Sequence, residues 1–198
     1  MYGIDLLVEE HNNILRMKNA IRKICIKILE GDNLNIDKFE KIIDFGKNYA
    51  DKHHHQKEEK ILFKVMIEKL GPVANTLIKN GMLVEHDLGR LHMMQLVDAT
   101  NKYKKNPKTE YKMDIIFNAL AYGDLLQRHI DKENIAAYNY ADRVLCKEDK
   151  IFINKETEIL ENLYKLYGHF FTTNLLPKID EINFEKITLE QIYSTTFA

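Results

Sequence analysis

The sequence predicts an all-α protein, an up-down-up-down antiparallel four-helix bundle with an additional C-terminal helix. Apolar residues recur at spacings of three and four along most of the chain, which is typical of amphipathic helices. Gly and Pro are scarce, with eight and three copies, and they fall between the periodic segments, where turns are needed. Short connections between long helices require neighbouring helices to run antiparallel.

Turn signals delimit the expected helices in order. Gly31 follows the first, Gly71-Pro72 separates the second from the third, and Asn106-Pro107 separates the third from the fourth. Proline is favoured in the first turn of a helix, so Pro72 suits the start of the third. The expected helices cover about residues 4–30, 36–70, 72–105 and 109–146.

A fifth helix is expected over about residues 155–180, after a polar gap, and Pro177 should end or kink it. Residues 1–148 are therefore predicted to form the bundle, and residues 149–198 a C-terminal helical extension.

Composition excludes several classes of function. The chain has 198 residues and a formal net charge of −1, with 29 basic and 30 acidic residues. This balance argues against nucleic-acid and anionic-membrane partners, which require a basic surface. No apolar stretch is long enough to cross a bilayer. The chain begins without the pattern of a signal peptide, so a cytoplasmic location is expected. Cys25 and Cys146 lack metal-site spacing and are expected to be small buried hydrophobes.

A repeated histidine–glutamate element carries the chemistry. His54 and Glu58 on the second expected helix, and His129 and Glu133 on the fourth, are each four residues apart. Residues at this spacing share one face of a helix, so both pairs can reach the same ion or two neighbouring ions. Mixed imidazole and carboxylate donors suit iron, manganese or zinc.

The register of the hairpins brings two more histidines to the same level. Counted from the predicted turns, His11 and His86 lie about as far along their helices as the two pairs do. All of these polar residues share a helix face with apolar neighbours and should point into the core, where unpartnered polar groups are costly. The predicted metal ligands are His11, His54, Glu58, His86, His129 and Glu133. A buried polar network without metal is the alternative.

Other polar residues receive weaker assignments. His53 and His55 are expected at the solvated flanks of the second helix, although His55 and Glu59 form a rival pair with the same spacing. His92 is expected at the surface or between helices, and His169 is expected to be structural.

Five residues near the proposed ligands could support the site. Glu10 and Glu85 could accept hydrogen bonds from ligand histidines, and Gly89 could leave room for a small ligand. Tyr122 and Tyr140 share the predicted face of His129 and could donate hydrogen bonds to a ligand, or simply pack in the core.

Over about residues 4–146 the chain resembles the hemerythrin-like (HHE) cation-binding family, whose hallmark is His-x-x-x-Glu repeated in a four-helix bundle. The resemblance rests on both pairs, on His11 and His86, and on the run from Lys57 to Phe63. It implies a cofactor of two iron ions (Fe2+/Fe3+) with an oxo or hydroxo bridge, with zinc or manganese as alternatives. It also implies that Glu58 and Glu133 bridge the ions and that the four histidines are terminal ligands.

The sequence departs from the oxygen-carrying members of that family. Arg90 stands four residues after His86, where those proteins have a second histidine. The set of four histidines and two glutamates is more similar to proteins that repair iron–sulfur centres under oxidative or nitrosative stress.

The leading functional hypothesis is a di-iron protein that binds, senses or reacts with O2 or NO. The alternatives are a reductase of O2, peroxide or NO served by a redox partner protein, an iron donor for cluster repair, and a helical interaction module with a regulatory metal. The sequence leaves open whether the protein is an enzyme and whether it forms a homodimer.

Overall fold

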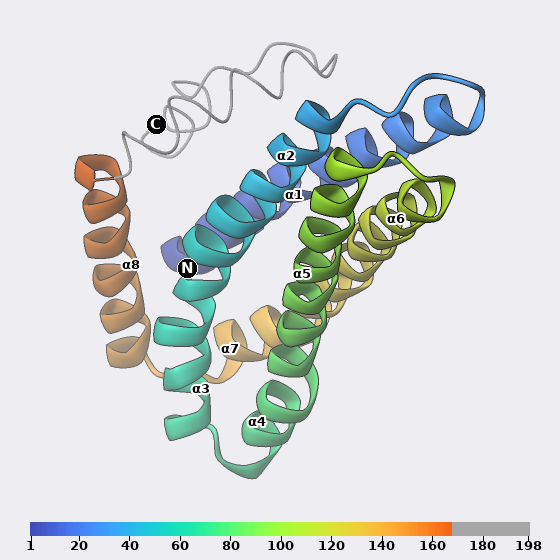
Figure 1. Cartoon of the computed structure of the whole chain (residues 1–198). Helices are drawn as coiled ribbons and strands as arrows, with labels where there is room; N and C mark the ends of the chain where they lie inside the picture. The colour runs from blue at the N-terminus through green and yellow to red at the C-terminus, as the bar shows by residue number, and fades with distance from the viewer. Residues whose placement is uncertain (168–198) are drawn as a thin grey trace.

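The computed structural model describes residues 1–167, and these form helices with no strand. Four long helical rods run alternately up and down, and an additional helix lies outside them (Figure 1). The prediction of an all-α bundle with a C-terminal helix is confirmed.

The first rod is α1 (Tyr2–Leu29), a continuous helix. It ends at Gly31, whose φ of 115° lies in the region that favours glycine. The next helix starts with a cap, because the Asn35 side chain accepts a hydrogen bond from the backbone N–H of Lys38 at 3.3 Å. The predicted turn between the first two helices is therefore present.

The second rod is helical throughout but not uniformly α-helical. It consists of α2 (Ile36–Asp44), the π-helix η1 (Phe45–His55), the π-helix η2 (Glu58–Leu62) and α3 (Phe63–Lys69). A π-helix bonds each N–H to the carbonyl five residues back, so it has more residues per turn than an α-helix. The residues that face the core therefore do not follow the α-helical count.

The third and fourth rods also contain π-helical segments. The third rod consists of α4 (Gly71–Leu77), η3 (Ile78–Met82) and α5 (Leu83–Lys105), and the fourth of α6 (Thr109–Lys132), η4 (Glu133–Tyr138) and α7 (Asn139–Val144). The predicted breaks fall where expected: Gly71 has a φ of 74°, Pro72 lies at the start of α4, and Pro107 lies between α5 and α6.

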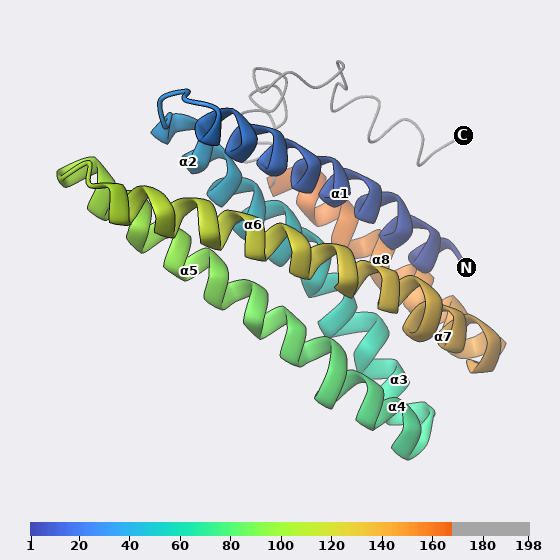
Figure 2. The same ribbon diagram turned by 90° about the vertical axis from the view of Figure 1, so that its right-hand side faces the viewer.

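The rods pack as neighbours with opposite directions. Contacts join α5 to α6, α1 to α6 and α2 to α5, and Figure 2 shows α1 and α6 side by side along their length. The interior holds two apolar clusters. Along α1, Leu7 belongs to one cluster and Ile14 to the other, with the buried Glu10 and His11 between them. A polar layer thus interrupts the core.

The additional helix α8 (Lys147–Tyr167) starts earlier than predicted. The polar residues taken as a gap include Glu148 and Asp149, which lie in its first turn, where carboxylates favour the helix N-terminus. It packs against α1 and η2, and the side chain of Asn154 accepts a hydrogen bond from the N–H of Gly3 at 3.0 Å. Pro177 and His169 lie outside the described residues.

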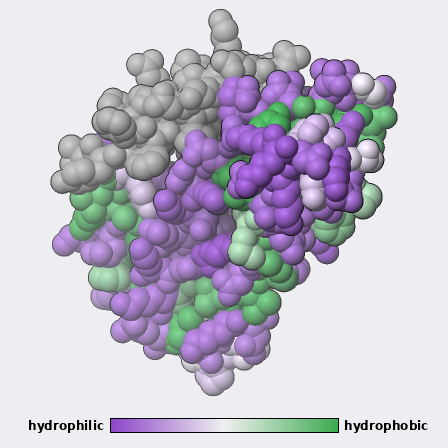
Figure 3. Space-filling view, in the orientation of Figure 1, coloured by the Kyte–Doolittle hydropathy of each residue, from purple (hydrophilic) through white to green (hydrophobic). Residues whose placement is uncertain are grey.

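The surface agrees with the balanced charge. The face in Figure 3 is mostly hydrophilic, with small separate apolar areas. Within residues 1–167, no helix combines the length and the apolar character that crossing a membrane requires. Cys25 is buried as predicted, but Cys146 is exposed, because it lies in the short link between α7 and α8.

Candidate metal centre

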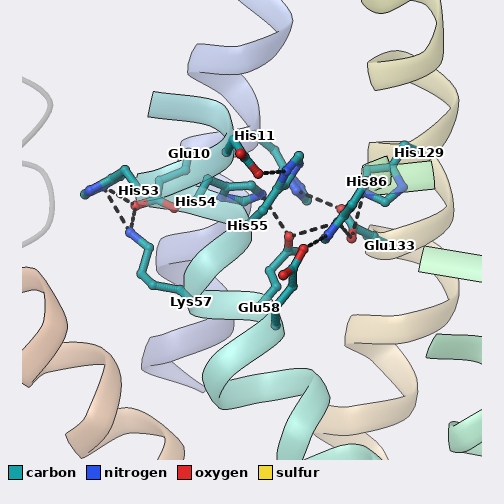
Figure 4. Close-up of polar contacts among 12 residues, drawn as sticks. Glu10, His11, His53, His54, His55, Lys57, Glu58, His86, His129 and Glu133 are labelled. Carbon is teal, nitrogen blue, oxygen red and sulfur yellow. Dashed lines mark hydrogen bonds and ion pairs between the residues drawn. The ribbon is translucent and has the colours of Figure 1, made fainter. Parts of the chain in front are cut away.

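The six predicted ligands meet in the polar layer between the two apolar clusters (Figure 4). Each of the four rods contributes: α1 supplies a histidine, the second rod a histidine and a glutamate, α5 a histidine, and the fourth rod a histidine and a glutamate. All six side chains are at most 2% exposed: His11, His54, Glu58, His86, His129 and Glu133. The predicted common depth is therefore observed.

The two glutamates lie at the middle of the layer. Glu133 is 3.2 Å from the Nε2 of His11, 3.0 Å from the Nε2 of His129 and 3.6 Å from the Nε2 of His86. Glu58 is 3.6 Å from the Nε2 of His54 and 3.5 Å from the Nε2 of His86. The imidazoles therefore surround two neighbouring carboxylates, with their Nε2 atoms directed inward.

The outward Nδ1 atoms of the same histidines have their own partners. Glu10 lies 2.8 Å from His54, and Glu85 lies 3.0 Å from His129, as predicted. Two further partners were not predicted: Glu59, 2.6 Å from His86, and Asn134, 3.0 Å from His11. Carboxylates and amides on one ring nitrogen orient the other toward a metal, which is the usual outer environment of a metal-binding histidine.

Several inward atoms of this layer lie close to one another but make no hydrogen bond of acceptable geometry. They are the Nε2 atoms of His54, His86 and His129, the Oε2 of Glu58 and both carboxylate oxygens of Glu133. Leaving such groups unpaired in the interior costs several kcal/mol in total. Cations placed among them would pair with imidazole nitrogens and carboxylate oxygens together, so the donor set fits metal ions.

The protonation states also suit a metal. Burial lowers the pKa of His54 to about 4 and lowers that of His55 well below its ordinary value, so both rings are neutral at pH 7. Burial and the nearby Glu133 raise the pKa of Glu58 well above its usual range. The pKa of Glu133 is instead lowered: burial opposes this, but His129, His11 and His86 outweigh it. Burial beside Glu133 therefore favours the protonated form of Glu58 when no metal is bound.

The family model of the hemerythrin HHE cation-binding domain matches residues 2–141. The chain belongs to this family. The resemblance inferred from the sequence is confirmed, and with it the presence of a cation-binding domain. Searches of curated proteins and of solved structures found no match. Helix α8 begins after the matched range.

In this hemerythrin-family chain, His55 corrects the sequence prediction. It was expected at a solvated flank, but it is 4% exposed and stacks on His86, with ring centroids 3.9 Å apart and planes 11° apart. Donor atoms of His55, His86 and His129 lie within 4.8 Å of one another, and so do those of His11, His54, Glu58 and Glu133. The layer therefore contains two groups of side chains that could each hold a metal ion.

His53 was also expected at a solvated flank, and it is only 6% exposed. The two errors have different causes. The larger number of residues per turn in the π-helix η1 turns His55 toward the layer. His53 points to the other side of the rod, toward Lys57 (Figure 4), where Glu161 and Tyr164 of α8 bury it. The His-His-His run followed by a paired glutamate was the available signal. The rival pairing of His55 with Glu59 is not formed, because Glu59 contacts His86 instead.

Tyr138, not Tyr140, faces the site. Its hydroxyl donates to the Oε1 of Glu58 at 2.5 Å and lies 3.4 Å from the Nε2 of His11. Tyr140 is half-buried and packs against the apolar cluster around α3 and α7. The π-helix η4, which ends at Tyr138, shifts the inward face relative to the α-helical count.

Arg90 occupies the position where the oxygen carriers have a second histidine. Its guanidinium contacts Asp51 at 2.8 Å, Glu59 at 2.6 Å and Asp87 at 2.9 Å. Because Glu59 also contacts His86, Arg90 fixes the outer partner of a candidate ligand. This residue supports the layer rather than entering it.

A cavity of about 220 Å³ adjoins the layer between η1 and α5. His55 and Arg90 form part of its wall, and Gly89, Met93 and Tyr122 form another part. Gly89 therefore borders a space near the site, and Tyr122, which also packs in the apolar core, lines the same space. His92 lies between helices, 3.2 Å from Asn118.

Proposed function

We propose that this protein holds two iron ions in the polar layer and binds, senses or reacts with O2 or NO there. The observation that carries the proposal is the convergence of unpartnered donor atoms from all four rods. Three histidines, His55, His86 and His129, would hold one ion. His11, His54, Glu58 and Glu133 would hold the other, and both glutamates also approach His86 of the first group.

The donors and the proposed chemistry together favour iron. Imidazole and carboxylate together suit iron, manganese and zinc, and the two groups contain no sulfur donor. Two iron ions supply redox chemistry that zinc lacks, and they can exchange electrons with a diatomic molecule. The residues themselves would position these ions and exclude water, and Glu58 would bind as the carboxylate.

The cavity supports a diatomic ligand. It is large enough to admit a small molecule, and His55, one of the three histidines on that side, forms part of its wall. The wall combines the apolar side chains of Met93 and Val97 with charged side chains, among them Arg90. The hydroxyl of Tyr138 lies on the opposite group of donors, where it can hold Glu58 in place.

The test is anaerobic reconstitution with ferrous iron, followed by metal analysis and titration with O2 or NO. Two irons per chain and a reversible change in the absorption spectrum are expected for binding or sensing. Sustained turnover with a reductant would assign a reductase, and loss of iron to an apo-cluster acceptor would assign repair. No iron uptake would refute the proposal and leave an interaction module.

Variants assign the ligands. His55→Ala and Glu133→Ala should each lower the bound iron below two per chain, because each removes a donor from the layer. His92→Ala is the matched control, since His92 lies outside both donor groups. Equal iron content in His55→Ala and His92→Ala would remove His55 from the site.

A further inference from the structure

A buried lysine lies beside the candidate metal centre. Lys57 is 1% exposed. Its ammonium group contacts Glu10 and the Nε2 of His53, the latter at 3.0 Å (Figure 4). It also donates to the Oε1 of Glu161 at 2.5 Å. A charge at this depth requires compensation, and the carboxylates of Glu10 and Glu161 provide it.

Glu10 connects this lysine to a candidate ligand. One of its oxygens contacts Lys57, and the other accepts a hydrogen bond from the Nδ1 of His54 at 2.8 Å. All of these groups are shielded from water, so their charges act on one another with little screening. The strength with which Glu10 accepts from His54 therefore depends on how much of its charge Lys57 neutralises.

Glu161 brings the additional helix into this chain of contacts. It belongs to α8, which begins after the range matched by the family model. Tyr164 of the same helix donates to the backbone carbonyl of Lys52, and its ring lies edge-on to His53 at 4.7 Å. Helix α8 is thus held against η1 beside His54, and it places a carboxylate on Lys57.

The group formed by Glu10, His53 and Glu161 is not a third metal site. Their donor atoms lie close enough together to hold a cation, but Lys57 contacts all three. The ammonium group already supplies the positive charge that this cluster needs.

We propose that Glu161 is a positioning residue through which α8, acting by way of Lys57 and Glu10, sets the electron-donating strength of His54. The inference rests on the proposed function, because His54 must bind a redox-active metal for the effect to reach the centre. Glu161 shares Lys57 with Glu10, which leaves Glu10 more negative. A more negative Glu10 accepts more strongly from the Nδ1–H of His54, makes that ring a better donor and favours the ferric state.

The sign of each substitution follows. Glu161→Gln keeps the size of the side chain but removes its charge, so Lys57 is drawn to Glu10 alone and the reduction potential of the centre should rise. Lys57→Met removes the cation, so Glu10 becomes more negative and the potential should fall. A residue that only maintained packing would shift the potential in one common direction or not at all.

The experiment measures the reduction potential of the iron-loaded full chain in wild type, Glu161→Gln and Lys57→Met. Glu158→Gln is the matched control, because Glu158 is an exposed glutamate on the same helix and should leave the potential unchanged. Opposite shifts in the first two variants support the proposal. A shift of the same sign in both, or equal potentials for Glu161→Gln and Glu158→Gln, would overturn it. If Lys57→Met does not fold, the two glutamate variants decide.

A second measurement separates this inference from the proposed function. In the metal-free protein, the Nδ1–H proton resonance of His54 reports its hydrogen bond to Glu10. This resonance should move upfield in Glu161→Gln and stay in place in Glu158→Gln. Failure of the wild type to take up iron would refute the proposed function, whereas an unchanged His54 resonance in Glu161→Gln would refute the contact chain itself.

Discussion

Replacing Tyr138 by phenylalanine removes one hydroxyl from the candidate metal centre and leaves the ring in place. The ring is 2% exposed and stacks on His11 at a centroid distance of 5.4 Å, so its packing should survive. The lost contact is the hydrogen bond to the Oε1 of Glu58 at 2.5 Å. Its strength depends on the charge of Glu58.

The two charge states of Glu58 give the magnitude. In the metal-free protein the raised pKa of Glu58 favours its neutral form, and a hydrogen bond between neutral groups contributes about 0.5–1.5 kcal/mol. Metal binding requires the carboxylate, to which a hydrogen bond contributes about 1.5–3 kcal/mol. The difference, roughly 1–1.5 kcal/mol, corresponds to about a tenfold loss of metal affinity, within the range known for such outer partners.

The assay is competition with a chelator for ferrous or zinc ions, alongside denaturant unfolding of the metal-free protein. Tyr138→Phe should bind metal about tenfold more weakly and lose about 1 kcal/mol of unfolding free energy. Tyr122→Phe is the control, since Tyr122 is also buried but has no hydrogen-bond partner for its hydroxyl within the described residues. Equal metal affinities for the two variants would refute the reasoning.

Three further predictions follow from burial, charge and backbone geometry. Burial raises the pKa of Cys25 to about 11, so at pH 8 a thiol reagent should label exposed Cys146 alone in the native protein and both thiols in denaturant; rapid double labelling would contradict this. Because burial lowers the pKa of His54 from 6.5 to about 4, His54 takes up a proton at a higher pH in the unfolded metal-free chain than in the folded one. The difference in unfolding free energy between wild type and His54→Gln should therefore be largest above pH 6.5. It should fall by about 3 kcal/mol by pH 4 in denaturant titrations. A difference that does not change with pH would disprove this. Gly71→Ala should lower the unfolding free energy by about 1 kcal/mol, because φ is 74° there. Gly81→Ala, in a helix with open space around its Cβ, should raise it by about 0.5–1 kcal/mol, and equal signs would refute the argument.

The sequence was sufficient for the fold and for the six central side chains. Turn residues at Gly31, Gly71 and Pro107 located the hairpins, and counting from them placed His11 and His86 at the level of the paired motifs. The fold and the level of these side chains along the bundle depend on helix direction and rise per residue, which small local irregularities change little. Spacing in the sequence is therefore enough to predict both.

The finer assignments failed where the helices change type. The inward positions of His55 and Tyr138 depend on the angle between successive residues, and the π-helical segments η1 and η4 change that angle. His53 is buried for another reason, because α8 covers it. The run of three histidines was a signal in the sequence, but spacing alone did not give the changed angle. The start of α8 was missed for another reason, because acidic residues that stabilise a helix N-terminus are polar and were taken as a gap.

The π-helical segment η1 also bears on how a ligand set can be conserved. If His55 binds metal as proposed, the donor absent from the third rod at Arg90 has been supplied from the second, and the number of imidazoles is kept while their helix of origin changes. A π-helical turn allows this change of helix, because neighbouring residues can both face the interior. Related chains should therefore be compared by the positions of their donor atoms in space. An alignment of each helix by itself would count the histidine missing from the third rod as a lost ligand.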